Sequence, residues 1–381
     1  MALPIPRTIF TEEHELFRAT VRRFMEEEVA PHMERWMAQG HVDRDVWLKA
    51  GALGFLCCTV AQEYGGSGAD RLYSAILIEE QQRVNCVGPG FALHSDIVAP
   101  YLARIGTEAQ KLQWLPRMAR GELVGAIAMT EPGAGSDLKN IATSAVFDGD
   151  QILINGSKTF ITNGYLADLV IVAVRTDPQL AGKGLSLVLV ETDRGGFRRG
   201  RPLAKIGQKA QDTCELFFEN VRVPRSHLLG ERGQGFAYLM QELPWERLIN
   251  AIRAVAAAEF AVDETVRYTK ERRVFGKPVL DFQNSRFRLA ECRTQVQLAR
   301  VYVDRCLELV TYGALDTQSS AMAKWWCSEM QNRVIDACLQ LHGGYGYMSE
   351  YPIARAYVDA RAQMLYAGTN EIMKEIIGRQ L

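Results

Sequence analysis

The chain lacks the residue patterns that hold metals or build disulfide frameworks. Its eight cysteines include no CxxC pair, and most stand singly within apolar or helical-looking stretches. Its six histidines include no HxxxH spacing and no close pair with an acidic residue. We therefore expect no metal site, and we expect reduced thiols, as in a cytosol-like compartment.

The chain also lacks an excess of either charge and lacks long apolar runs. Lys and Arg number 44 against 45 Asp and Glu, which gives no basic surface for nucleic acid. No stretch of about eighteen apolar residues occurs, as a membrane-spanning helix would require. The first residues show no basic segment followed by an apolar one, so we expect no targeting peptide. A cytoplasmic protein of two or three domains is the expectation for 381 residues.

Three regions differ in the spacing of their apolar residues. Residues 1–122 favour helices, because apolar side chains recur there at three- and four-residue intervals, as in EEHELFRATVRRF. Residues 123–230 hold short runs such as DLVIVAVRTD, which predict strands of an antiparallel sheet or barrel. Residues 231–381 return to long helical patterns joined by short loops, typical of an antiparallel bundle. The sequence therefore predicts an α+β multidomain protein with helical, β and helical domains in that order.

Glycines punctuate the β region at two places. The Asn155-Gly156 step favours positive φ angles and predicts a tight hairpin between ILI and KTFIT. MTEPGAGSD carries Gly133 and Gly135, which let backbone N–H groups approach a ligand, but it lacks the third glycine of GxGxxG. A plain turn and a ligand loop therefore both stay open. In KTFITNG, Phe160 either stacks on a planar ring or belongs to an ordinary half-buried strand.

Two helix ends of the C-terminal region also have two interpretations each. ERRVFG ends a helix with Arg272 and Arg273, which either complement the helix dipole or bind a phosphate. QLHGGYGYM ends another with more glycines than a simple stop requires, so we expect close backbone approach to a ligand. His342 in that stretch is either a base or a hydrogen-bonding group at a helix end.

Glu246, in QELPWERLINA, raises the same question for catalysis. If Pro244 is the first helical residue, Glu246 falls at the third helical position, where a carboxylate caps exposed N–H groups. Its neighbours Trp245, Leu248 and Ile249 are large and apolar, and such surroundings raise the pKa of a carboxylate toward that of a useful base. These local patterns leave both interpretations open.

Five motifs in order carry a family resemblance: AMTEPGAGSD, KTFITNG, YTKERRVFG, QLHGGYGYM and YAGTNEI. Together they resemble the acyl-CoA dehydrogenase family from about Phe10 to the last residues, and MQELPWERL with GTNEIMKE is most similar to its long-chain branch. The resemblance implies an N-terminal helical domain, a middle antiparallel β-barrel and a C-terminal four-helix bundle. It also implies a homotetramer with one FAD per subunit that takes part in fatty acid β-oxidation.

The resemblance also implies which residues meet the cofactor and the substrate. Arg and backbone N–H donors suit the pyrophosphate of FAD, which accounts for the glycines and the basic helix end. The implied FAD contacts, some of them across a subunit interface, are Met129, Thr130, Gly135, Ser136, Phe160, Ile161, Thr162, Arg272, Phe275, Gln283, Gln340, Gly343, Gly344, Thr369 and Glu371. The implied acyl-CoA contacts are Ser136, Pro244, Arg247, Tyr366 and Gly368.

One departure from the family pattern bears on Glu246. Many members carry their base directly after the Tyr of the Tyr-x-Gly-Thr stretch, where this chain has Ala367, which cannot take a proton. The long-chain and isovaleryl members place a Glu in a stretch similar to LPWERL, so the resemblance makes Glu246 the base. The backbone N–H of Ala367 would then be a donor to the enolate oxygen. The implied reaction removes the α-proton and passes the β-hydride to flavin N5, giving a trans-2-enoyl-CoA.

The resemblance leaves the electron acceptor and the acyl group open. The family passes electrons to an electron-transferring flavoprotein, which we expect as the partner. Related acyl-CoA oxidases use O2, and a redox-silent acyl-CoA-binding homologue is a further alternative, motivated by Ala367. Chain length and branching depend on packing at the pocket floor, which these motifs do not specify.

Overall fold

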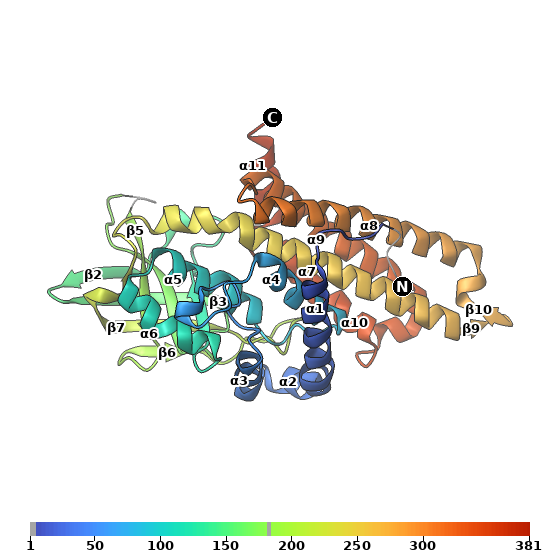
Figure 1. The fold of residues 1–381 in the computed structure, drawn as a ribbon, viewed down its shortest axis with the longest axis horizontal. Helices are drawn as coiled ribbons and strands as arrows, with labels where there is room; N and C mark the ends of the chain where they lie inside the picture. The colour runs from blue at the N-terminus through green and yellow to red at the C-terminus, as the bar shows by residue number, and fades with distance from the viewer. Residues whose placement is uncertain (1–4, 181–183) are drawn as a thin grey trace.

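The computed structural model describes residues 5–180 and 184–381, and the chain forms three regions in series (Figure 1). The first is helical, and its predicted helical character is confirmed. Its helices are α1 (Glu12–Phe24), α2 (Met33–Gln39), α3 (Arg44–Ala52), α4 (Arg71–Arg83), α5 (Ala99–Ile105) and α6 (Glu108–Ala119), with π-helical segments at Met25–Val29 and Leu93–Val98.

Local side-chain chemistry explains where α1 and α6 begin. Thr11 caps α1, and the His14 side chain bonds back to the Thr11 backbone in a capping box. Thr107 and Gln110 form the same device at α6, the helix that directly follows α5.

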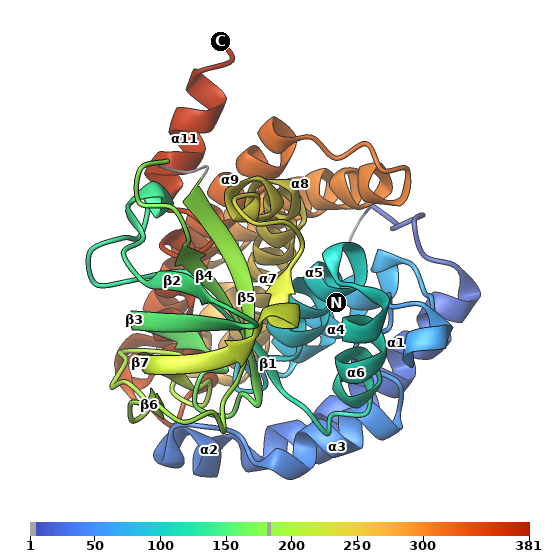
Figure 2. The same ribbon diagram turned by 90° about the vertical axis from the view of Figure 1, so that its left-hand side faces the viewer.

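The second region is built on one eight-stranded sheet (Figure 2). The hydrogen-bonded order is β6-β7-β3-β2-β4-β5-β8, with β1 paired to β4. Most pairs are antiparallel, but β1 and β2 each pair with β4 in parallel, and the described order has two ends, β6 and β8. A middle β domain is thus confirmed, while its sheet is mixed rather than purely antiparallel. The strands are β1 (Gly125–Ala128), β2 (Ser144–Asp148), β3 (Gln151–Thr162), β4 (Leu169–Arg175), β5 (Leu185–Glu191), β6 (Phe197–Arg199), β7 (Thr213–Pro224) and β8 (Leu228–Leu229).

The predicted hairpin at Asn155-Gly156 is wrong, because β3 runs straight through that step. The glycine is needed for another reason: a Cβ at Gly156 would lie 2.5 Å from the Thr143 hydroxyl oxygen. The register against β7 shifts there, as at a β-bulge. The tight turn instead connects β2 to β3 after Asp148, where Gly149 takes a positive φ of 58°.

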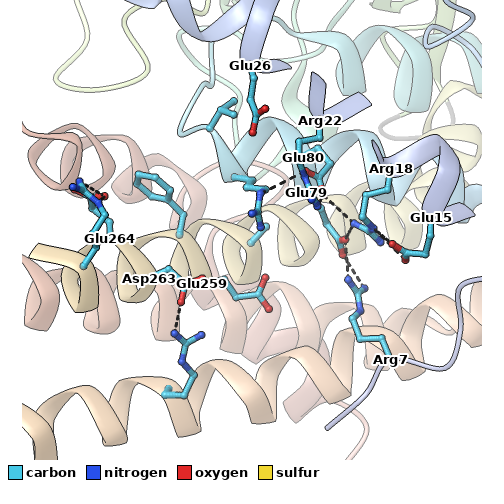
Figure 3. A pocket seen from close by; sticks show the side chains of 16 residues that line it. Arg7, Glu15, Arg18, Arg22, Glu26, Glu79, Glu80, Glu259, Asp263 and Glu264 are labelled. Carbon is cyan, nitrogen blue, oxygen red and sulfur yellow. Dashed lines mark hydrogen bonds and ion pairs between the residues drawn. The ribbon is translucent and has the colours of Figure 1, made fainter. Parts of the chain in front are cut away.

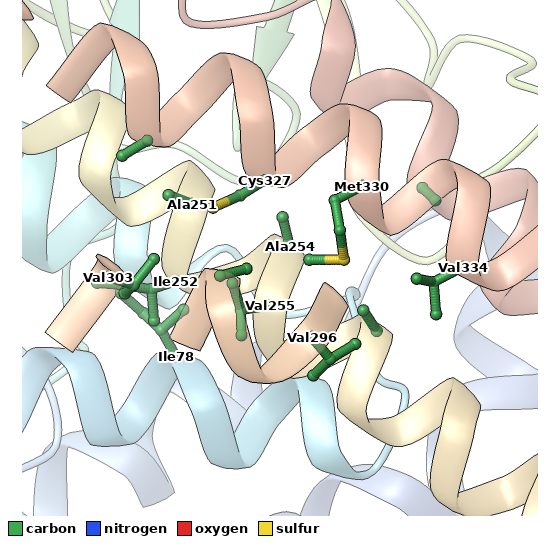
Figure 4. Packing of buried hydrophobic residues seen from close by; sticks show 14 of the residues in the cluster. Ile78, Ala251, Ile252, Ala254, Val255, Val296, Val303, Cys327, Met330 and Val334 are labelled. Atoms are coloured by element: carbon green, nitrogen blue, oxygen red, sulfur yellow. The ribbon is translucent and has the colours of Figure 1, made fainter. Parts of the chain in front are cut away.

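The third region holds the three predicted long helices, which pack on one another, and α7 and α8 also pack on α4. Figure 4 shows Ile78 of α4 beside Ile252 and Val303, within a core of small side chains such as Ala251 and Ala254. A C-terminal helical domain is confirmed, with a helix of the first region joined to its core. The helices are α7 (Gly235–Glu271), α8 (Gln283–Thr311), α9 (Thr317–His342), α10 (Pro352–Ala360) and α11 (Asn370–Gly378), and the hairpin β9 (Arg273–Val274) and β10 (Lys277–Pro278) joins α7 to α8.

Helix α7 spans the long axis of the molecule (Figure 1). Its first residues lie beside the sheet, and its last residues lead to the β9–β10 hairpin at the opposite end. Helix α11 projects away from the body in both ribbon views. Within the described ranges, no helix is both long and apolar enough to cross a membrane.

Candidate active site

Glu246 lies inside α7, far from either end of that helix. The helix begins at Gly235, so Pro244 is an interior residue and the interpretation of Glu246 as an N-terminal cap is wrong. Pro244 has no N–H, so it cannot make the helical bond that would close on the Met240 carbonyl. The Glu246 side chain is buried, with 6% of the residue exposed. A carboxylate in this position needs an explanation other than capping.

Burial and the neighbouring residues Tyr101, Glu242 and Arg247 affect the pKa of the Glu246 carboxylate. The Tyr101 hydroxyl of α5 donates a hydrogen bond of 3.1 Å to Glu246 Oε1. One helical turn before Glu246, Glu242 forms a 2.9 Å ion pair with Arg104. Burial raises the pKa of Glu246 to about 7, the Tyr101 hydroxyl lowers it, Glu242 raises it and Arg247 lowers it. The group can therefore accept a proton near neutral pH.

A strained backbone turn follows α10 in the stretch that the family motif identifies. Ala367 has a φ of 55° and Gly368 a φ of 85°. The positive φ of Gly368 favours glycine, and a Cβ there would also lie 2.8 Å from the terminal methyl carbon of Met373. No residue that the structure describes accepts a hydrogen bond from the Ala367 N–H. Non-glycine residues at positive φ concentrate at functional sites, and this one presents a free donor.

Several buried polar atoms around α7 have no partner in the described parts of the chain. They are Arg247 Nε and Asn250 Oδ1 on α7, and Gln363 Oε1 and Tyr366 Oη ahead of Ala367. The two groups are in contact, because the Asn250 amide donates to the Gln363 carbonyl at 3.1 Å. Buried polar atoms in proteins are nearly always satisfied, so this concentration fits a polar ligand bound here. Arg247 and Tyr366 were both predicted to contact the substrate.

A buried ion pair joins two of the predicted cofactor motifs on the β side. Lys158 Nζ lies 2.8 Å from Glu131 Oε1 and donates at 3.0 Å to the Met129 carbonyl. Burial lowers the pKa of Lys158 to about 8, and Glu131 counteracts that effect. The Thr159 N–H also donates to the Thr130 carbonyl at 2.9 Å. The loop after β1 is therefore fixed to the end of β3.

The surface formed by MTEPGAGSD and KTFITNG has the features of a ligand-binding surface. Phe160 is a bulky residue at a φ of 59°, and 67% of it is exposed. Side chains added at Gly133 or Gly135 would meet nothing within 4 Å, and Ser136 is exposed. Thr162 is half-buried, whereas the side chain of Ile161 packs in the core of the sheet. Of Ile161, only the backbone is therefore available to a cofactor.

Six of the remaining predicted FAD residues form a second group at the far end of α7: Arg272, Phe275, Gln283, Gln340, Gly343 and Gly344. Arg272 follows the last residue of α7, and Phe275 is 96% exposed at a φ of 50°. Gln283 and Gln340 are exposed, and added side chains at Gly343 and Gly344 would meet open space. Arg272 and three tyrosines, Tyr268, Tyr345 and Tyr351, line a hollow of about 600 Å³ at this end.

The two groups are too far apart to hold one cofactor within one chain. The stretch of α7 from Glu246 to its end spans roughly 38 Å at about 1.5 Å per residue. Figure 1 places the β9–β10 hairpin and the sheet at opposite ends of the molecule. Each group therefore offers only part of a dinucleotide site.

Three further predicted positions lie at helix ends: His342 at the end of α9, and Thr369 and Glu371 at the start of α11. His342 stacks on Tyr268 with ring centroids 4.2 Å apart, and its Nδ1 lies 3.0 Å from the Cys338 carbonyl. Burial lowers the pKa of His342, which favours the neutral hydrogen-bonding group over the base. Thr369 caps α11, accepting from the Ile372 N–H, and Glu371 is exposed in the first turn of that helix.

Sequence reasoning missed Tyr101 and the Lys158–Glu131 pair. Tyr101 is 145 positions from Glu246 in the chain, so no local pattern connects them. Lys158 and Glu131 each lie inside a motif that was singled out, KTFITNG and MTEPGAGSD. The signal available in the sequence was a lysine in one motif and a glutamate in the other, because buried charges are usually paired.

Comparison with known proteins matches three successive regions of the chain to the same family. Three acyl-CoA dehydrogenase family models match: the N-terminal domain at residues 11–122, the middle domain at 126–221 and the C-terminal domain at 233–381. The mouse (Mus musculus) mitochondrial long-chain specific acyl-CoA dehydrogenase is 54% identical over 377 residues, 98% of this chain and 88% of that protein.

Solved structures agree with the sequence comparison. The acyl-CoA dehydrogenase of Geobacillus kaustophilus superposes with a TM-score of 0.97 at 52% identity, covering 98% of this chain and 99% of the other. The butyryl-CoA dehydrogenase of Megasphaera elsdenii gives 0.92 at 34% identity, covering 97% and 98%. The family binds FAD and acts on acyl-CoA. With all three domain models matched in order, the chain belongs to the acyl-CoA dehydrogenase family of flavoprotein oxidoreductases.

Proposed function

We propose that the protein catalyses FAD-dependent α,β-dehydrogenation of an acyl-CoA thioester to the trans-2-enoyl-CoA, with Glu246 as the base. The observation that carries the proposal is the buried Glu246 carboxylate, whose pKa is raised to about 7. A buried acid without a paired cation is expensive to keep, and a poised base is the use for which such a pKa suits it. The partnerless Arg247 and Tyr366 atoms support a substrate pocket at the same place.

The chain supplies both halves of the α-proton transfer. The free N–H of Ala367 would donate to the thioester carbonyl oxygen and stabilise the negative charge that develops there. The ionised Glu246 would then take the α-proton, while the electron pair of the broken C–H bond remains on the substrate and enters the new double bond. Burial of Glu246 excludes water from the site and strengthens these interactions.

The residues on the β side fit the flavin end of FAD. FAD, when bound, supplies the acceptor for the hydride that leaves the β-carbon. The exposed Phe160 and the open glycines after β1 would hold its ring system, with Ser136 at the edge of the site. Arg272 and Phe275 would hold the pyrophosphate and adenine side of a cofactor bound to another copy, since they lie too far away within one chain. This arrangement requires at least two copies of the chain, and the homotetramer that the family resemblance implies would provide them.

The acyl group and the electron acceptor follow from the relatives. The 54% identity to a long-chain specific acyl-CoA dehydrogenase supports a long-chain fatty acyl-CoA as the substrate. We propose an electron-transferring flavoprotein as the acceptor of the electrons. A reduced flavin that is slow with O2 would favour this acceptor over oxidase activity.

The proposal is tested by anaerobic titration of the purified holoenzyme with acyl-CoAs of increasing chain length. We expect the flavin absorbance to bleach with the wild-type protein, most completely with the preferred chain length. Glu246→Gln should bind the same thioesters, as seen in a perturbed flavin spectrum, without bleaching. If the wild-type flavin does not bleach with any acyl-CoA, the proposed reaction is wrong and a redox-silent binding protein is the better account.

A further inference from the structure

We propose that Tyr101 is a positioning residue for the base: its hydroxyl holds Glu246 Oε1, so that Oε2 is the oxygen that takes the α-proton. This inference rests on the proposed function of Glu246. The Tyr101 Oη to Glu246 Oε1 distance is 3.1 Å. In contrast, Oε2 receives no hydrogen bond from any residue that the structure describes. The two oxygens of one carboxylate are therefore distinguished by the protein.

Tyr101 is itself held firmly enough to orient another group. It is 1% exposed and packs in the apolar cluster that contains Leu102 and Trp114. A tyrosine ring so enclosed has few rotamers available, so its hydroxyl occupies a defined point. Burial, together with the nearby Glu246, raises the pKa of Tyr101 well above its ordinary value. The phenol is therefore a donor throughout the working pH range.

Adjacent contacts fix the register of α7 against the segment that carries Tyr101. Arg104, almost one turn after Tyr101 on α5, donates to Gln241 Oε1 at 2.8 Å and pairs with Glu242 at 2.9 Å. The Trp245 indole N–H donates to the Asp96 carbonyl at 3.1 Å. These contacts stand in sequence along α7 and end at Glu246. A base held in this way needs less reorganisation before proton transfer.

The charged groups around Glu246 give the Tyr101 bond a distinct electrostatic role. On α7, Glu242 raises the pKa of Glu246 and Arg247 lowers it. From α5, Arg104 pairs with Glu242, and from α4, Arg71 lies over the Trp245 ring at 4.6 Å. Among these described groups, Tyr101 alone donates a hydrogen bond to Glu246. Because that bond favours the ionised carboxylate, removing it should leave the base protonated to a higher pH.

The test compares Tyr101→Phe with a matched control, Tyr302→Phe. Tyr302 also loses a hydroxyl bond, of 3.2 Å to the Ser319 carbonyl, but that bond joins α8 to α9 away from Glu246. The readout is the rate constant of anaerobic flavin reduction from pH 5.5 to 9 with saturating acyl-CoA. For Tyr101→Phe we expect the acid limb to move up by about one pH unit and the plateau to fall about tenfold. Acyl-CoA affinity should stay within about twofold, and Tyr302→Phe should match the wild type.

A second variant should shift the acid limb of the pH profile in the opposite direction, to lower pH. Site-specific 3-fluorotyrosine at position 101 keeps the ring and makes the hydroxyl a stronger donor, so the acid limb should move to lower pH. This variant also carries the test if Tyr101→Phe does not fold. If each variant at position 101 that folds has the same acid limb and the same plateau as the wild type, the positioning role of Tyr101 is wrong. Failure of the base assignment looks different, because Glu246→Gln would then still reduce the flavin.

Discussion

Two buried glutamates, Glu79 on α4 and Glu246 on α7, show how the same side chain is put to opposite uses. Their exposed fractions are nearly equal, 5% and 6%. Figure 3 shows Glu79 beside Arg7 and Arg18, which each lie 2.8 Å from its oxygens. Arg300, outside that view, lies 2.7 Å from Glu79 Oε1. Glu246 instead has one neutral donor, Tyr101.

The different partners shift the pKa values of the two glutamates in opposite directions. Burial alone would raise the pKa of Glu79, but Arg7, Arg300 and Arg18 outweigh it and lower the pKa far below its usual range. For Glu246 burial prevails, and the pKa rises to about 7. Burial thus says little about function by itself, whereas the supply of cations separates a structural carboxylate from one that can take up a proton.

The largest expected effect is on catalysis at Glu246. Glu246→Gln removes the proton acceptor and keeps the shape, so the rate of flavin reduction should fall about 10³-fold, as for loss of a general base. The melting temperature should not fall, because an amide costs less to bury than an acid that must ionise. Stopped-flow absorbance and a thermal scan check both points. A variant that unfolds, rather than losing only reduction, would give Glu246 the structural role assigned to Glu79.

The matching substitution at Glu79 should affect stability instead. Glu79→Gln removes the counterion that Arg7, Arg18 and Arg300 share. Each arginine keeps at least one other carboxylate, Asp304, Glu80 or Glu259, so the loss in the free energy of unfolding should be about 3 kcal/mol, the lower end for a broken buried pair. Denaturant titration measures this loss. The flavin-reduction rate per folded molecule should stay near the wild-type value. A large fall in that rate with stability intact would contradict the division between the two glutamates.

The same pair predicts opposite responses to acid in stability. The pKa of Glu79 is lowered by folding, so its contribution is complete above its ordinary value of 4.5 and is lost as the pH falls below it. The pKa of Glu246 is raised by folding, so its contribution is complete below 4.5 and is lost as the pH rises toward 7. Unfolding measured from about pH 2 to 8 should therefore lose part of its dependence below 4.5 in Glu79→Gln and part of its dependence near 6 in Glu246→Gln.

The smallest expected effect concerns Lys158, where a buried cation meets a carboxylate. Lys158→Met removes the charge and leaves Glu131 with only the Ala142 and Thr143 N–H donors. The loop after β1 should loosen, and FAD should be released about tenfold more readily, the loss of roughly one charged hydrogen bond. FAD titration of the deflavinated protein measures this. Unchanged FAD affinity would make the pair irrelevant to the cofactor face.

The sequence predicted those features that depend on local residue patterns. The order of helical, β and helical regions and the three long C-terminal helices follow from spacing that repeats within a segment. Glu246 was singled out because its motif and its apolar neighbours lie within a few residues. Phe160, Phe275 and Ala367 came from the family motifs, and all three have positive φ angles, which the sequence does not reveal.

Features that depend on distant residues were missed or wrong. Pro244 was taken as a possible helix start, yet packing against α4, α8 and α9 carries α7 through it. The Asn155-Gly156 step satisfies the hairpin rule, but the close approach of Thr143 explains its glycine instead. Arg300 is 221 positions from Glu79, so their pairing needed the fold. Such contacts are set by tertiary structure, which overrides local preference.

The most direct test of the account is the pH dependence of flavin reduction in the wild-type protein. A single turnover with saturating acyl-CoA, followed by stopped-flow absorbance from pH 5 to 9, reports the ionisation of the base. Because Glu246 must be ionised to accept the α-proton, we expect the rate constant to fall about tenfold per pH unit below about 7. A rate constant that is flat across this range would contradict the assignment of Glu246 as the base.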